Sequence, residues 1–147
     1  MKPIILLLII LFTMPTYAHD HLTTVTSAHS VKDTADKFAQ LVEAKGLTLF
    51  ARIDHAANAK GVDLELAPTE LVLFGNPNVG TKLMQCAPTV AIDLPQKALI
   101  WEDADGSVKL AYNTPAYVKE AHSLEGCDPI IEKITGLLAG LAAAATE

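Results

Sequence analysis

Polar side chains that could form a binding site stand at the ends of short apolar segments between residues 53 and 112. His55 ends one segment, the stretch from Gly75 to Lys82 follows another, and Lys97 leads into a third. Binding residues concentrate on loops that a rigid scaffold holds in place. We therefore expect a small ligand, an anion among the options, to bind beside residues 75–81. The candidate ligand-binding residues are His55, Asn76, Gly80, Thr81, Lys97 and Tyr112.

The segment Gly75–Lys82, with the sequence GNPNVGTK, has the order of a phosphate-binding P-loop, in which a strand, a Gly-x-x-x-x-Gly loop and a helix follow one another. Its last two positions are reversed, because Thr81 precedes Lys82 where that motif has lysine first. Pro77 also removes one backbone donor. These departures argue against a nucleotide triphosphatase. A weaker carboxylate or phosphate site at a helix N-terminus, or a turn that needs glycine, remains open.

His55 follows Asp54 at the end of a predicted strand, where an imidazole could act as a general base, a metal ligand or a donor to an anion. The plainer alternative is a histidine bonded to a backbone carbonyl. In a hydrolase- or lyase-like enzyme, His55 would be the catalytic acid/base and Asn76 part of an oxyanion cradle. No serine stands in a Gly-x-Ser-x-Gly elbow. We therefore favour a binding role over catalysis.

Metal and cofactor motifs are missing from the sequence, which contains no HExxH or CxxC segment. We expect no cofactor and no structural zinc. One weak metal candidate is His19 with His21, because a free amine at His19 and an imidazole at the third position can bind Cu(II) or Ni(II). That site requires cleavage directly before His19.

Residues 1–18 have the features of a secretory signal peptide. Lys2 gives the positive start, and the apolar run 4–12 is too short for the ~20 residues of a membrane span. Thr16 and Ala18 suit the small positions before a cleavage site. We expect a periplasmic or secreted protein with one mature domain, residues 19–147; a retained anchor is the alternative.

The mature chain is acidic, since cleavage removes Lys2 and no acidic residue and so changes the net charge from −6 to −7. An acidic chain without a basic cluster repels phosphate groups, so we expect neither nucleic acid nor a membrane surface as a partner. Cys86 and Cys127 give an even cysteine count, which favours a disulfide in an oxidising compartment. Two buried free thiols, or a reactive thiol, are the alternatives.

Local patterns predict the elements that position these residues. Ser30 three residues before Asp33, and Thr114 directly before Pro115, are helix-start signals. The residues Leu47, Leu49, Ala51 and Ile53 alternate and are expected to share one face of a strand. The predicted strands cover residues 23–28, 47–54, 70–74, 98–102 and 108–112, and the predicted helices begin after Ser30, near Gly80, after Thr114 and at Asp128.

This order of elements favours an α+β fold of two layers, with a twisted, mainly antiparallel sheet and helices packed on one face. The segments IDHAA, FGNPNVGTKLMQ, IDLPQKALIWEDADG and YNTPAYVKEAH resemble the domain-of-unknown-function 302 family over nearly all of the mature chain. That resemblance implies a small α+β domain, often dimeric, with no settled activity. A homodimeric interaction module, joined through residues 70–74 or the last helix, is therefore a third function to consider.

Overall fold

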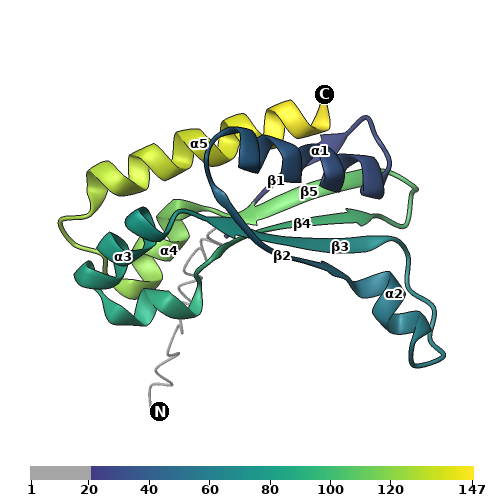
Figure 1. Ribbon diagram of the computed structural model, residues 1–147, viewed down its shortest axis with the longest axis horizontal. Coiled ribbons are helices and arrows are strands. Elements are labelled where there is room, and N and C mark those ends of the chain that lie inside the picture. Colours follow the sequence, from purple (N-terminus) through teal and green to yellow (C-terminus); the bar gives the residue numbers. More distant parts are fainter. Residues whose placement is uncertain (1–20) are drawn as a thin grey trace, which may run out of the picture.

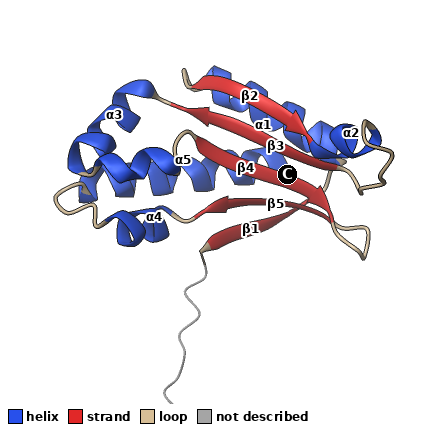
Figure 2. Ribbon diagram, turned by 90° about the horizontal axis from the view of Figure 1, so that it is seen from below, coloured by secondary structure: helices blue, strands red, loops and turns tan. Residues whose placement is uncertain are grey.

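The computed structural model describes residues 21–147, and the predicted signal peptide and His19 lie outside this range. Its centre is one antiparallel sheet in the order β1-β5-β4-β3-β2. Figure 2 shows the strands in front of the two longest helices, and within residues 21–147 no helix lies over the opposite face of the sheet. The two-layer α+β prediction is confirmed. The strands are β1 (Leu22–Ser27), β2 (Thr48–Asp54), β3 (Thr69–Gly75), β4 (Gln96–Glu102) and β5 (Val108–Asn113).

The helices begin at local capping signals in the sequence. Ser30 caps α1 by accepting a hydrogen bond from the backbone N–H of Asp33, and Thr114 caps α4 in the same way through Tyr117. Both predicted starts are confirmed. The helical elements are α1 (Val31–Ala44), α2 (His55–Lys60), α3 (Pro77–Cys86), the 3₁₀ helix η1 (Pro88–Ile92), α4 (Pro115–His122) and α5 (Asp128–Thr146).

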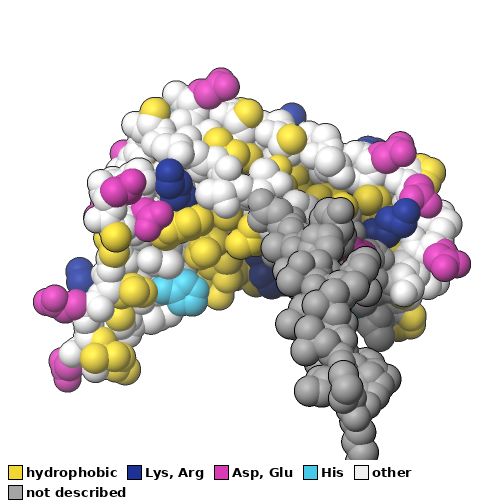
Figure 3. Space-filling view, turned by 180° about the vertical axis from the view of Figure 1, so that it is seen from behind, with side chains coloured by type: hydrophobic (Ala, Val, Ile, Leu, Met, Phe, Trp, Pro, Cys, Tyr) yellow, Lys and Arg dark blue, Asp and Glu magenta, His cyan; other side chains and the backbone are white. Residues whose placement is uncertain are grey.

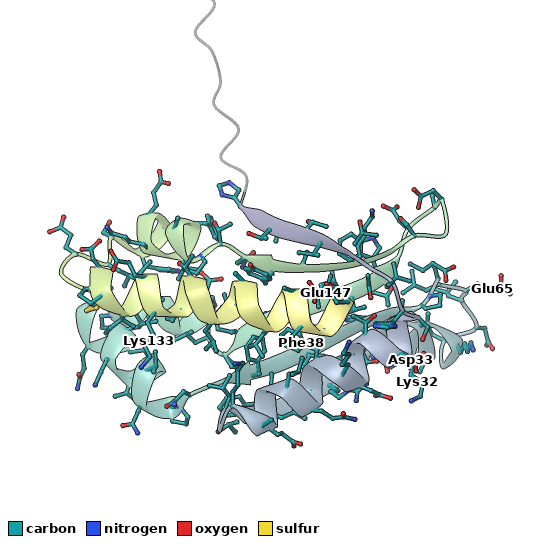
Figure 4. All side chains as sticks on the ribbon, turned by 90° about the horizontal axis from the view of Figure 1, so that it is seen from above. Lys32, Asp33, Phe38, Glu65, Lys133 and Glu147 are labelled. Carbon is teal, nitrogen blue, oxygen red and sulfur yellow. A yellow bond between two sulfur atoms is a disulfide. The ribbon has the colours of Figure 1, made fainter. Side chains whose placement is uncertain are left out.

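The hydrophobic core lies between the sheet and the two longest helices, α1 and α5, which cover the same face (Figure 1). Phe38 of α1 and Phe74 of β3 meet edge to face, with 5.1 Å between ring centroids, and each is 1% exposed. Figure 4 places Phe38 between α1 and α5. Aromatic pairs of this geometry stabilise a fold beyond the area that they bury.

The expected alternation in the second strand is wrong, because β2 contains a bulge between Leu49 and Ala51. Leu49 pairs with the buried Phe74, whereas Ala51 pairs with Leu73. Adjacent residues of β3 point to opposite faces, so Leu49 lies on the helix side and Ala51 on the uncovered side. The extra residue is Phe50, which the bulge leaves 52% exposed at the edge of the sheet.

The last helix, α5, begins at Asp128, as predicted, and extends to Thr146. Among the described residues it is the one helix long and apolar enough to cross a membrane by length and composition. A third of that stretch is buried inside the protein, where Ile134, Leu138 and Leu141 pack into the core. This buried third packs against the sheet and α1.

Cys86 and Cys127 form a disulfide, as predicted. The bridge joins the end of α3 to the residue before α5, with 6.7 Å between the Cα atoms. Cys127 is buried, so the bridge is anchored in the core. It fixes two helices that also form the walls of the cavity described next.

Candidate functional site

A cavity of about 360 Å³ opens between α3, the first half of α5, and the ends of β2 and β3. Its volume falls within the range of small-molecule pockets. Most lining side chains are apolar: Leu47, Phe50, Phe74, Val79, Leu83, Met84, Leu94, Ile134, Leu137 and Leu138. The cavity lies where the candidate loop was predicted, beside residues 75–81.

The lining contains no charged side chain among the described residues. Its polar side chains are Asn76, Thr81 and Gln96, and all three are uncharged. Asn76, Gly80 and Thr81 are therefore the sequence candidates that the structure brings to one cavity. The walls are suited to an apolar ligand with a few hydrogen-bonding groups.

The segment after β3 is helical, where the sequence suggested an open loop. The helix α3 begins at Pro77, three residues before the predicted start at Gly80, and Asn76 is its N-cap. The Asn76 side-chain oxygen accepts from Asn78 N–H at 2.9 Å, and its carbonyl oxygen accepts from the N–H groups of Val79 and Gly80. The donors of this first turn already have acceptors, so they do not form a free anion cradle.

His55 lies at the far end of the strand pair from Asn76. It is the first residue of α2, directly after Asp54, which pairs with Glu70, whereas Thr48 pairs with Gly75. These two ends are five residues apart along β3, roughly 16 Å at the usual rise of a strand. The structure therefore does not bring His55 and Asn76 into one catalytic arrangement.

Lys97 and Tyr112 also lie outside the cavity lining. Lys97 donates hydrogen bonds from its ammonium group to the carbonyl oxygens of Asp93, at 3.0 Å, and Pro95, at 3.2 Å. Tyr112 is a buried residue of the core. Both side chains have structural partners that account for their positions.

Two further polar clusters hold elements together. His122 of α4 contacts the Asp93 carboxylate through Nε2 at 2.6 Å and the Thr89 hydroxyl through Nδ1 at 3.2 Å, which ties α4 to η1 and the segment after it. No lining residue of the cavity belongs to this His122 cluster. The His122 cluster holds α4 against η1 and Asp93, which indicates a structural role.

The second cluster joins α1 to the sheet through Arg52, whose guanidinium contacts Asp36 at 2.7 Å and Glu70. Hydrogen bonds from Lys32 and Arg52 lower the pKa of Asp36. Within residues 21–147, no group of three or more His, Cys, Asp or Glu side chains lies close enough to hold a metal ion. The ring of His21 packs against Tyr117, and its proposed partner His19 is outside the described range.

Sequence reasoning missed the apolar walls of the cavity, above all Phe50. Apolar lining residues and core residues look alike in a sequence, so Leu83, Ile134 or Leu138 gave no separate signal. Phe50 did give one, because it stands next to Leu49 and interrupts the alternation of the strand. An apolar residue out of phase in a strand is a signal for a bulge.

Comparison with known proteins identifies the family. The model of the family described as "Domain of unknown function DUF302" matches residues 23–141, which is most of the chain. The chain belongs to the DUF302 family. A crystal structure of an uncharacterized conserved DUF302 protein from Bacillus stearothermophilus has the same fold, with a TM-score of 0.77, 15% identity, and coverage of 86% of this chain and 98% of that one.

Two curated relatives match part of this chain with a segment of their own longer chains. They are named Fluoride-specific ion channel FluC 1, from Brucella suis biovar 1 (strain 1330), and FluC 2, from Brucella melitensis biotype 1 (strain ATCC 23456 / CCUG 17765 / NCTC 10094 / 16M). Each is 48% identical over 103 residues, which is 70% of this chain. The match covers 41% of the first relative and 38% of the second, so this chain spans about two fifths of their length.

Proposed function

We propose that this DUF302 domain binds a small molecule in the cavity between α3 and α5. The observation that carries the proposal is the cavity itself, with apolar walls, three uncharged polar side chains and a volume of about 360 Å³. A cavity of this kind is the default location for a ligand in a protein of unknown function. The enzyme alternative with His55 and Asn76 lacks support, because these residues lie at opposite ends of a strand pair.

Filling the cavity should abolish ligand binding without unfolding the protein. Gly80 lines the cavity, and a Cβ atom added there would stand 3.6 Å from Leu94, an ordinary contact distance. A leucine at this helical position would occupy the space while improving helix propensity by about 0.8 kcal/mol. We expect Gly80→Leu to abolish the fluorescence rise of the uncharged dye N-phenyl-1-naphthylamine and to leave the melting temperature unchanged or higher.

Gly136→Leu is the matched control. Gly136 lies in α5, and a Cβ there would meet no atom within 4 Å in the part of the chain that the structure describes. This variant makes the same chemical change on the surface, so it should bind the dye like the wild type. Equal dye binding by both variants would show that the dye does not enter this cavity.

Export to the periplasm or the exterior is part of the proposal. The disulfide between Cys86 and Cys127 supports it, because structural disulfides persist mainly in oxidising compartments. Fluoride transport is not part of it. The family model alone spans residues 23–141, which is enough to account for a 103-residue match to the named channels.

A second proposed function is a homodimer joined through the sheet face that carries no helix. The alternation of the strands places Leu71, Leu73, Leu99 and Trp101 together on this face. Hydrophobic side chains gather in a hollow of the molecule seen from behind (Figure 3). Exposed apolar patches mark interaction sites, and a second copy would cover this one.

Replacing an apolar residue of this uncovered face by a charge should separate the dimer. We expect the wild type to sediment as a dimer at micromolar concentration and Trp101→Lys to sediment as a monomer, because a lysine there would lose its hydration in the interface. Leu64→Lys is the control, since Leu64 is already exposed in the segment after α2. A wild type that sediments as a monomer would contradict the dimer.

A further inference from the structure

We infer that the α3–α5 cavity takes the alkyl chain of an uncharged amphiphile. This inference rests on the proposed function and adds the chemical class of the ligand. The sequence had left an anion among the options, and the geometry of the site decides between these two classes. Three features carry the choice: the lining, the occupied backbone donors and the position of Phe50.

The lining gives a buried charge nothing to bind. No charged side chain lines the cavity among residues 21–147, and the N–H groups of Asn78, Val79 and Gly80 already have acceptors within the first turn of α3. A carboxylate or phosphate placed inside would lose its hydration without gaining a cation or a donor. The apolar part of a ligand would meet no such penalty.

The walls and volume suit a flexible hydrocarbon chain. Branched aliphatic side chains of α3 face those of α5, and Met84 adds an unbranched side chain that adapts to irregular ligands. At roughly 30 Å³ for each group of the size of a water molecule, a volume of about 360 Å³ holds roughly a dozen such groups. An alkyl chain of medium length would fill it.

Phe50 marks the mouth of the cavity. The bulge in β2 leaves this ring 52% exposed while it still lines the cavity. A Cβ atom at Gly75 would stand 3.7 Å from the ring, so the ring lies close to the backbone at the end of β3. Thr81 also lines the cavity and is exposed, which lets a hydroxyl or amide head group beside it stay in contact with water.

A series of 1-alkanols tests this inference by displacement of N-phenyl-1-naphthylamine. From hexanol to decanol, affinity should rise about fourfold for each methylene, the factor expected for burying one such group. The gain should end near dodecanol, when the cavity is full. Decanedioate, with a carboxylate at each end, should not displace the dye, because one of its charges would have to enter the cavity.

Two variants connect the series to the site. Gly80→Leu should lose alkanol binding, and Phe50→Ala should weaken dodecanol about tenfold, since the ring covers the last groups of a long chain. Leu64→Ala, which removes an exposed apolar side chain that does not line the cavity, should change neither affinity.

The possible failures separate the inference from the proposed function. Displacement by decanedioate that Gly80→Leu abolishes would overturn the uncharged alkyl ligand and keep the cavity as a binding site. Alkanol affinity that does not depend on chain length would do the same. Binding of dye and alkanols that Gly80→Leu leaves intact would overturn both.

Discussion

Removal of the disulfide should lower the free energy of unfolding by about 4 kcal/mol, measured with the double variant Cys86→Ser, Cys127→Ala in urea. The bridge closes a loop with a sequence separation of 41, and its loss restores conformational entropy mainly to the unfolded chain. Alanine suits position 127 because that side chain is buried. The melting temperature should fall by roughly 10–15 °C.

Reduction provides the control for this prediction. Dithiothreitol should destabilise the wild type as much as the double substitution does, and it should have no effect on the variant. An unchanged melting temperature of the reduced wild type would show that the bridge contributes little. The same variant should also bind N-phenyl-1-naphthylamine more weakly, because the bridge holds α3 against α5 on either side of the cavity.

Local chemistry explains which parts of the fold were predictable. A helix start depends on a few adjacent residues, so Ser30 and Thr114 identified the beginnings of α1 and α4. The hairpin of β4 and β5 depends on the turn between them, and the residues Asp103-Ala104-Asp105-Gly106 are typical of such a turn. The disulfide was predicted from an even cysteine count in a chain that we expect to be exported.

The site was harder to predict, because its polar residues have structural roles. Asn76 carries the type of side chain that a ligand-binding loop uses, but an N-cap requires the same chemistry. His55 lies at the opposite end of the strand pair from Asn76, since antiparallel pairing places the end of β2 beside the start of β3. Strand ends that look alike in sequence can therefore lie at opposite edges of a sheet.

The largest loss of stability from one substitution should come from Phe74→Ala. This ring is 1% exposed and meets Phe38 edge to face, so truncation should cost about 3–5 kcal/mol, measured by urea unfolding. Phe74 also lines the ligand cavity, so its removal should enlarge that cavity. A long 1-alkanol could then fill the additional space, and dodecanol should raise the melting temperature of this variant more than that of the wild type.

Phe38→Ala separates cavity enlargement from general destabilisation. Phe38 is the other half of the same aromatic pair and is equally buried, but it does not line the cavity. Its truncation should destabilise the fold by a similar amount and gain no extra stabilisation from dodecanol. Equal rescue of both variants would mean that the alkanol stabilises a loosened core in general, whereas rescue of Phe74→Ala alone would place the chain against the end of β3.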